Sequence, residues 1–334
     1  IKGPTIQEYD QEGVVAPYNI DAIAQSEGWD KLLDPMIAAV HKCENNSGPY
    51  CAAPVNIHRI DWMWANKAVF DANGISVPTT WDEVNAAAEK LKAAGIIPFA
   101  HGGQAWQDAT VFEAVAMGIG GNNYYKNCYV DLKESCLRSE TTVKVFDQMR
   151  KLQSYTDEGS PGRDWNVATG MVIEGKAGFQ IMGDWAKGEF TAAGKVPGVD
   201  YYCAPTPSNN GYLYNVDSFI FYKTSDPEKQ EGQKLLAKLM MGKNFQKVFN
   251  LYKGSIPARL DVPMDEFDKC AKTSNSDIKT AGASGGLVPS FAHGMAQGNT
   301  MKAALQDIIT EHFNSDMSSV DAANALADSV LANM

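Results

Sequence analysis

The stretch from Ala177 to Phe190 reads AGFQIMGDWAKGEF. Its first six residues are mostly apolar and end at Met182, which predicts a short buried strand. The run Gly183-Asp184-Trp185 follows this strand at once and ends it. In open α/β sheets, ligands bind outside the carboxyl ends of the strands, so this run is a candidate ligand site.

A second strand is predicted from Ile96 to Ala100, and it ends in a similar way. It is followed by HGGQAWQD, residues 101–108, which contains Trp106. A sugar needs flat aromatic faces for its C–H patches and Asp, Gln, Lys or His side chains for its hydroxyls. Trp106 and Trp185 are therefore candidate stacking residues. The alternative is that both are core residues at helix starts.

Strands alternate with helices along the rest of the chain, which is the pattern of parallel α/β sheets. Joints that carry Pro or Gly fall near Pro54, at 211–215 and at 254–257. In an α/β chain of two domains, three such joints predict that the chain crosses between the domains several times.

Two capping boxes predict helix starts, one at Thr5 with Glu8 and one at Thr80 with Glu83. Only four residues precede Thr5, whereas an α/β domain normally places a strand before its first helix. We therefore expect the given sequence to begin inside a domain.

The 334 residues include 29 Lys and Arg against 40 Asp and Glu, a formal net charge of −11, and 44% are hydrophobic. This composition indicates a globular chain long enough for two domains. An acidic chain lacks the basic face that nucleic acid or anionic lipid requires, so we expect neither as a partner. No apolar run approaches the roughly 18 residues of a membrane-spanning helix. The first residue is Ile1, so we expect that an upstream segment, with its signal peptide, was removed or is missing from the given sequence.

The six cysteines are Cys43, Cys51, Cys128, Cys136, Cys203 and Cys270. The first four form two pairs, each closing a short polar segment, and such spacing is typical of local disulfides. We also expect the last two to bond to each other. Disulfides indicate an oxidising compartment, whereas the alternative is buried free thiols in a cytosolic protein.

Catalytic and metal motifs give little support to an enzyme. The chain has no P-loop, H-E-x-x-H or EF-hand pattern, and its five His have no metal-ligand spacing, so we expect no metal and no cofactor. Residues 282–286 match G-x-S-x-G, but Pro289 follows closely and opposes the helix of a nucleophile elbow, so we expect a loop. Among 40 acidic residues, two could lie close enough to form the carboxylate pair of a glycoside hydrolase. A secreted carbohydrate-active hydrolase is therefore the alternative function.

Three segments read APVNIHR at 53–59, WMWAN at 62–66 and VPTTWDE at 77–83. Together they resemble the interdomain segment of the family-1 extracellular solute-binding proteins, which are the sugar-binding proteins of ABC importers. The P-x-T-W-D-E pattern alone is shared across this wider family.

Three further segments read GGQAWQD at 102–108, SPGRDW at 160–165 and MGDWAKGEF at 182–190. They resemble the glucose-binding branch of that family, and G-D-W-A-K-G-E-F is the more specific marker. The similarity covers essentially the whole chain.

The resemblance implies a two-lobed α/β periplasmic-binding-protein fold with several interlobe crossings and a ligand cleft. We expect residues 1–58 and 217–259 to form the first lobe, and residues 59–216 and 260–334 the second. The protein would be a periplasmic monomer that binds a monosaccharide, with glucose as the expected ligand. It would deliver the sugar to an ABC permease in the inner membrane and catalyse no reaction.

By the same resemblance, eight residues are expected to bind the sugar. Asp217 follows one crossing and can accept two ring hydroxyls, and Lys253 ends a helix just before another. The alternative is that these two side chains pair with each other and that His293 is a surface cap. The full expected set is Lys2, His58, Gln104, Trp106, Trp185, Asp217, Lys253 and His293.

The sequence also departs from the family pattern. Members begin with a strand that carries adjacent aromatic residues, and with about one more strand–helix unit, before the segment that matches Ile1-Lys2-Gly3-Pro4. We therefore expect the first lobe of this chain to lack that unit and the aromatic residues that would stack on the sugar.

Overall fold

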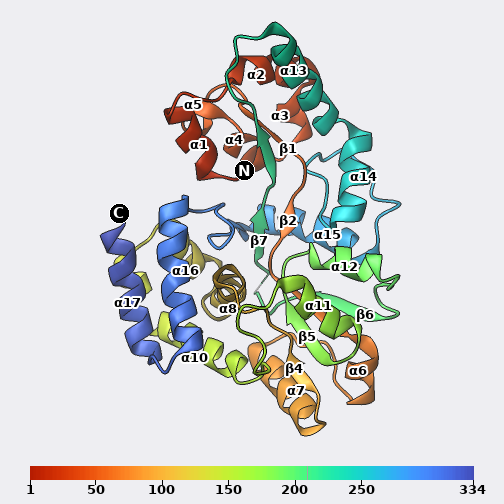
Figure 1. Ribbon diagram of the computed structural model, residues 1–334, viewed down its shortest axis with the longest axis vertical. Coiled ribbons are helices and arrows are strands. Elements are labelled where there is room, and N and C mark those ends of the chain that lie inside the picture. The colour runs from red at the N-terminus through yellow and green to blue at the C-terminus, as the bar shows by residue number, and fades with distance from the viewer. Residues whose placement is uncertain (209) are drawn as a thin grey trace.

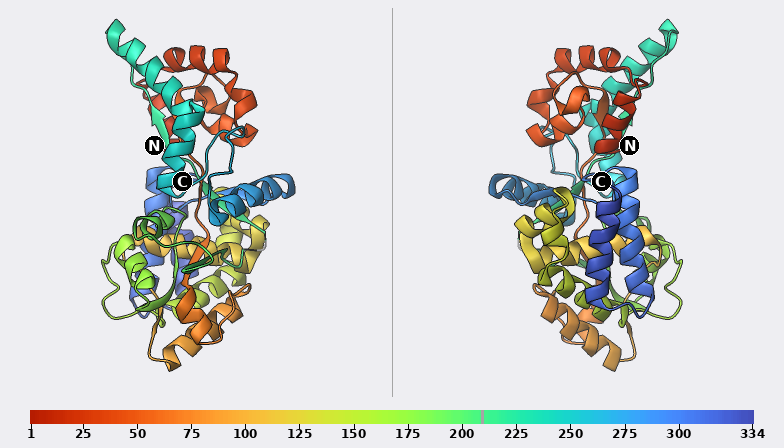
Figure 2. Two further views of the ribbon diagram at one scale, coloured as in Figure 1. Left: turned by 90° about the vertical axis from the view of Figure 1, so that its right-hand side faces the viewer. Right: turned by 90° about the vertical axis from the view of Figure 1, so that its left-hand side faces the viewer.

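The computed structural model describes residues 1–208 and 210–334, and it has two bodies joined by a narrow waist (Figure 1). Each body combines distant parts of the sequence, since the N-terminal helices lie beside residues 227–253 in the upper body (Figure 2). The upper helices are α1 (Pro4–Gln11), α2 (Pro17–Glu27), α3 (Trp29–Leu32), α4 (Pro35–Val40), α5 (Cys43–Asn46), α13 (Pro227–Met241) and α14 (Lys243–Lys253).

The lower body combines the middle of the chain with its C-terminal helices, while α15 (Lys269–Ser284) lies at the waist (Figure 1). No helix in the two described ranges has the length and hydrophobicity needed to cross a membrane. The lower helices are α6 (Lys67–Ala72), α7 (Trp81–Ala93), α8 (Ala105–Tyr125), the π-helix η1 (Lys126–Val130), α9 (Glu134–Leu137), α10 (Glu140–Gln153), α11 (Trp165–Ile173), α12 (Ala186–Ala192), α16 (Asn299–Asn314) and α17 (Ser319–Ala332).

The lower body contains a four-stranded sheet in the order β4-β5-β3-β6. Strands β4 and β5 are parallel, but β3 runs antiparallel to both of its neighbours. The prediction of parallel sheets is therefore wrong for β3, which enters from the waist and does not follow a helical crossover. The strands are β3 (Trp62–Asn66), β4 (Ile97–Phe99), β5 (Ala177–Ile181) and β6 (Tyr201–Pro205).

Paired strands carry the chain through the waist. Strand β1 (Ala52–Pro54) pairs antiparallel with β8 (Ser218–Ile220), and β2 (His58–Arg59) pairs antiparallel with β7 (Tyr212–Asn215). Strand β9 (Leu287–Pro289) lies parallel to β7 on its other side. A third passage follows α14, where Ile256 forms a bridge with Ile57. These passages confirm the prediction of several crossings.

Two large apolar clusters form the cores of the two bodies. Trp29 and Met241 are buried in the upper cluster, and Phe112 and Phe179 in the lower one. Val262 also packs in the upper cluster, although it follows the limit predicted at residue 259. The proposed lobe limits therefore stay a prediction.

The two capping boxes have different outcomes. Thr80 accepts a hydrogen bond from the backbone of Glu83, whose side chain caps in return, so this prediction is confirmed. The prediction at Thr5 is wrong, because α1 begins at Pro4 with Gly3 as its N-cap and no side-chain cap. Proline at the first helical position has a preset φ and needs no donor, so the helix begins two residues earlier than predicted.

The G-x-S-x-G match at 282–286 lies at the end of α15, where Gly285 adopts a positive φ of 73°. The expected loop is therefore mostly the last turn of a helix. A helix precedes the serine and strand β9 follows it, which is the reverse of a nucleophile elbow.

All three predicted disulfides form, namely Cys43–Cys51, Cys128–Cys136 and Cys203–Cys270. The first two close short local loops. The third joins β6 to α15 across a separation of 67 residues, and so ties the lower sheet to the helix at the waist.

Candidate ligand-binding site

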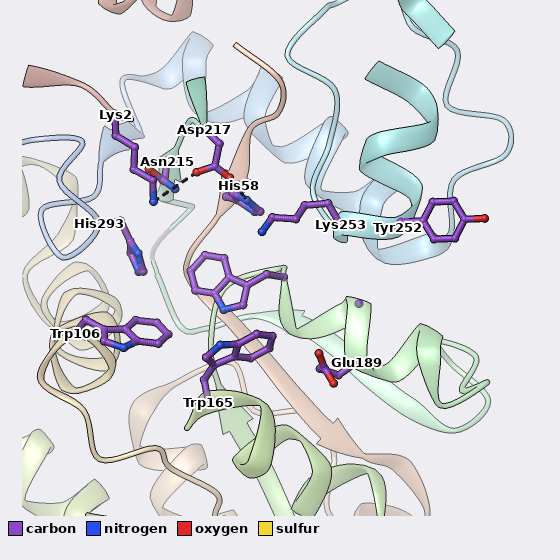
Figure 3. Close-up of a pocket in the computed structure, with 12 residues that line it drawn as sticks. Lys2, His58, Trp106, Trp165, Glu189, Asn215, Asp217, Tyr252, Lys253 and His293 are labelled. Carbon is purple, nitrogen blue, oxygen red and sulfur yellow. Dashed lines mark hydrogen bonds and ion pairs between the residues drawn. The ribbon is translucent and has the colours of Figure 1, made fainter. Parts of the chain in front are cut away.

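A cleft of about 500 Å³ lies between the two bodies, where the waist strands approach α8, α11 and α12. Figure 3 shows charged and amide side chains along its upper side and the rings of Trp106 and Trp165 along its lower side. The lining residues are Lys2, His58, Trp106, Trp165, Trp185, Gly188, Glu189, Asn215, Asp217, Tyr252, Lys253 and His293.

Seven of the eight expected ligand residues line this cleft. Gln104 is not among the lining residues in the described part of the chain. Its Oε1 accepts a hydrogen bond from Nε1 of Trp106 at 2.8 Å, and its Nε2 donates to Oδ1 of Asp164 at 2.6 Å. Gln104 thus orients Trp106, which itself lines the cleft.

Asp217 is the centre of a polar network at the upper side of the cleft. Its Oδ2 lies 3.0 Å from Nε2 of His58 and 3.0 Å from Nδ2 of Asn56. Its Oδ1 lies 3.5 Å from Nζ of Lys2. The other ring nitrogen of His58 is hydrogen-bonded to the buried carboxylate of Asp184. The imidazole is thus held between two carboxylates.

This arrangement shifts the pKa values of His58 and Asp217. Burial alone would lower the pKa of His58, but the carboxylates of Asp184 and Asp217 outweigh it and raise the pKa above its ordinary value. Burial alone would raise the pKa of Asp217, but His58, followed by Lys2 and Asn56, holds it well below its usual range. At neutral pH the cleft therefore presents an ionised Asp217.

Lys253 enters the cleft from the end of α14. Gly254 follows it with a φ of +93°, and a Cβ there would lie 2.3 Å from the backbone oxygen of Asp184, so only glycine permits this close approach. Asp217 pairs with Lys2 and His58, and no ion pair joins it to Lys253 among the described residues. The alternative in which these two residues pair is therefore wrong.

Three tryptophans from three helix starts form the lower side. Trp106 is the second residue of α8, Trp165 the first of α11, and Trp185 the N-cap of α12. The ring centroid of Trp185 lies 6.3 Å from that of Trp106 and 4.9 Å from that of His293. Each tryptophan packs on an apolar cluster and also lines the cleft, so both sequence interpretations apply.

Asn215 at the end of β7 is unusual among the lining residues. It is only 1% exposed, and neither its Nδ2 nor its Oδ1 has a hydrogen-bond partner within the described chain. A buried polar group without a partner costs about 1–3 kcal/mol. This amide is therefore available to a polar ligand in the cleft.

The sequence prediction did not include five of the lining residues. Trp165 ends the segment 160–165 and Asn215 ends the joint 211–215, both of which were singled out from the sequence. Gly188 and Glu189 also lay in such a segment, since both belong to the run 182–190, whereas the sequence offered no signal for Tyr252. The five are Trp165, Gly188, Glu189, Asn215 and Tyr252. Across residues 1–208 and 210–334, no group of three or more His, Cys, Asp or Glu is placed to hold a metal ion.

Residues 2–240 match the family of bacterial extracellular solute-binding proteins. The chain is 44% identical over 329 residues to a probable sugar-binding periplasmic protein of Brucella suis, in an alignment that covers 98% of this chain and 76% of the relative. A protein of the same description from Rhizobium meliloti is also 44% identical, with 98% of this chain and 78% of the relative covered.

Solved structures share the fold at low sequence identity. The bacterial solute receptor AcbH, described with an exclusive preference for β-D-galactopyranose, matches with a TM-score of 0.83 at 18% identity, covering 99% of this chain and 83% of AcbH. A chitin oligosaccharide binding protein matches with a TM-score of 0.80 at 19% identity, covering 99% and 82%. These matches confirm the predicted two-lobed fold.

The predicted family and compartment are also confirmed. The matching family is extracellular, and the relatives from Brucella and Rhizobium are named periplasmic proteins. Because the family match spans more than half of the sequence and the 44% identity extends over nearly all of it, the chain belongs to the bacterial extracellular solute-binding proteins.

Proposed function

We propose that the protein binds a monosaccharide, with glucose as the first candidate, and delivers it to the permease of an ABC transporter. The names of the relatives support a sugar as the class of ligand. Glucose rests on the resemblance of segments 102–108, 160–165 and 182–190 to the glucose-binding branch.

The observation that carries this proposal is the amide of Asn215, which has no partner in the part of the chain that the structure describes. A buried amide with a free donor and a free acceptor matches a hydroxyl group, which both donates and accepts hydrogen bonds. An apolar ligand would leave both amide atoms unsatisfied, so the cleft favours a ligand rich in hydroxyls.

The rest of the lining supports a sugar ring. The ionised carboxylate of Asp217 can accept from ring hydroxyls, and the ammonium of Lys253 can donate to a hydroxyl or to the ring oxygen. The indole of Trp185 offers an apolar face for the C–H patches of the ring. A pocket with aromatic surface and a few convergent polar groups is typical of small-molecule sites.

The way the two bodies are joined supports the proposed delivery. Asp217 and Lys253 approach the cleft from the upper body, whereas Trp106, Trp165 and Trp185 belong to the lower one. A hinge motion at the paired waist strands would close these surfaces on the sugar. The closed monomer would then present both bodies to the permease.

A carbohydrate-active hydrolase is less well supported. Its general acid must hold a proton at working pH, which requires a carboxyl group with a raised pKa. The pKa of Asp217 is instead held well below its usual range. Asp217 is therefore suited to accepting hydrogen bonds from a sugar and not to protonating a leaving group.

Intrinsic fluorescence tests the proposal, because three of the seven tryptophans line the cleft. We expect glucose to change the emission of the wild type and of Trp81→Phe, whose indole lies at the start of α7, away from the cleft. Trp185→Phe should lose most of the change. A panel of hexoses, pentoses and disaccharides that leaves the emission unaltered would contradict a sugar ligand.

A further inference from the structure

Helix α8 presents three side chains on the face that meets the cleft. Trp106, Thr110 and Glu113 are spaced by four and three residues, which places them on one side of a helix. Trp106 lines the cleft itself, whereas Thr110 and Glu113 are fully buried behind it. Both buried residues bind the segment 290–293, which carries His293 into the cleft.

The hydroxyl of Thr110 can be assigned a direction. Its Oγ1 lies 2.7 Å from the backbone oxygen of Trp106, which can only accept, so the single hydroxyl hydrogen is donated there. The same Oγ1 lies 2.9 Å from Nε2 of His293. Because Thr110 has no second hydrogen, Nε2 of His293 must be the donor in this contact.

Once Nε2 carries the ring hydrogen, Nδ1 of a neutral imidazole has a free lone pair. Burial, and then the charges of Lys2 and His58, hold the pKa of His293 well below its ordinary value, although Asp217 opposes them and Lys302 adds a smaller effect. The ring is therefore neutral at pH 7 and has one nitrogen left to accept a hydrogen bond.

Glu113 fixes the backbone that carries this ring. Its Oε1 is hydrogen-bonded to Oγ of Ser290 at 2.7 Å, and the same Oγ accepts from the backbone N–H of His293 at 3.1 Å. Its Oε2 accepts from the hydroxyl of Tyr125 at 2.9 Å and from the backbone N–H of Ala292 at 3.3 Å. Segment 290–293 is thus held to α8 at both its start and its ring.

We propose that Thr110 and Glu113 are positioning residues that hold His293 as the Nε2–H tautomer, so that Nδ1 accepts a hydrogen bond from a ligand hydroxyl. The part that concerns the ligand rests on the proposed sugar-binding function. The site then has a specific requirement, because the group opposite His293 must donate a hydrogen. A sugar with an O-methyl or fluoro substituent at that position loses this bond, whereas a free hydroxyl keeps it.

The tautomer can be tested without any ligand, by long-range ¹H–¹⁵N correlation spectra of the ¹⁵N-labelled protein. We expect the His293 signals of a neutral Nε2–H ring in the wild type and in Thr110→Ser, which keeps the hydroxyl. Thr110→Val should lose this single pattern, while Thr280→Val, which removes an equivalent hydroxyl bonded to the preceding turn of α15, should leave it intact. An Nδ1–H or doubly protonated His293 in the wild type would overturn the proposal.

Binding of glucose, measured by calorimetry, tests the second half. We expect Thr110→Val to weaken binding roughly fivefold to tenfold and Thr110→Ser to restore it. Burial raises the pKa of Glu113 to about 8, so Glu113→Gln mimics the form present at pH 7 and should keep both tautomer and affinity. Glu113→Leu should lose both.

A double-mutant cycle shows whether Thr110 acts through His293. In a His293→Ala background, Thr110→Val should cause no further loss of affinity, and an undiminished loss there would overturn the positioning role. If the wild type binds no sugar at all, the proposed function fails, while the spectra of the ligand-free protein still confirm or overturn the tautomer.

Discussion

The Nε2 atom of His58 lies 3.0 Å from Oδ2 of Asp217, although the two residues are 159 positions apart. His58 begins the short strand β2, and Asp217 lies between β7 and β8, which return to the upper body. Their contact therefore links two chain passages through the waist and places a carboxylate at the cleft.

Replacing Asp217 by Asn tests its role as an acceptor. Asn keeps the size but loses the charge and one acceptor oxygen, so glucose binding at pH 7 should weaken at least tenfold, in line with the roughly 1.5–3 kcal/mol of a charged hydrogen bond. Calorimetry measures this loss. Asp261→Asn is a matched control, because Asp261 pairs with Arg259 and Lys243 on the outer surface. Wild-type affinity in Asp217→Asn would remove this residue from the site.

The same pair predicts a dependence of stability on pH. The pKa of Asp217 is depressed in the folded state, so its stabilisation is complete above the unfolded value of about 4 and is lost as the pH falls below it. The difference in melting temperature between wild type and Asp217→Asn should therefore be full at pH 6 and should shrink toward pH 2. A difference that is constant across this range would mean that the charge of Asp217 contributes nothing.

The contribution of His58 to stability should depend on pH in the opposite direction. Its pKa is raised in the folded state, so its stabilisation is complete below the unfolded value of about 6.5 and is lost as the pH rises through the folded value. NMR titration should find that the ring of His58 loses its second proton at a pH above 6.5. A ring that is neutral at pH 6 would contradict this assignment.

Replacing Asn215 should change stability and ligand binding in opposite directions. Its buried amide has no hydrogen-bond partner among residues 1–208 and 210–334, so Asn215→Leu removes an unsatisfied polar group at similar volume. The ligand-free protein should therefore gain about 1 kcal/mol in free energy of unfolding. The same change should weaken glucose binding at least tenfold. Urea unfolding and calorimetry measure the two effects. A variant that loses stability and keeps its affinity would assign Asn215 a structural role.

Local signals predicted much of this molecule. The cap at Thr80 and two of the cysteine pairs involve residues close in sequence, so their spacing could indicate them. Trp106 and Trp185 were predicted as ligand residues because each lies in a polar and aromatic run that directly follows a predicted buried strand. The direction of β3 could not be predicted, because it depends on how the chain enters the lower body.

Other parts of the site depend on contacts between distant segments. The tautomer of His293 is assigned only because Thr110, 183 residues away in the sequence, lies beside its ring. The unpaired state of Asn215 is likewise a property of the assembled waist and not of its neighbours in sequence. For Gln104, the sequence motif was recognised but the predicted role differs from the observed contact. Its side chain accepts a hydrogen bond from Trp106 and does not line the cleft in the described part of the chain.

The three disulfides should differ in their contribution to stability. The bonds Cys43–Cys51 and Cys128–Cys136 each have a sequence separation of 8, whereas Cys203–Cys270 spans 67 residues. By loop-closure entropy, replacing the last pair by Ser should cost about 2 kcal/mol more than replacing either of the others. Urea unfolding of the three double variants tests this order. Equal losses would show that loop length does not govern their effect.

The central claim, that this cleft holds a sugar and releases it unchanged, is tested most directly by one calorimetric titration with glucose followed by chemical analysis of the recovered sugar. The account predicts saturable binding of one glucose per chain, the same sugar after prolonged incubation, and no cleavage of an added glucoside. Absence of binding across the monosaccharide panel, or release of glucose from the glucoside, would contradict it.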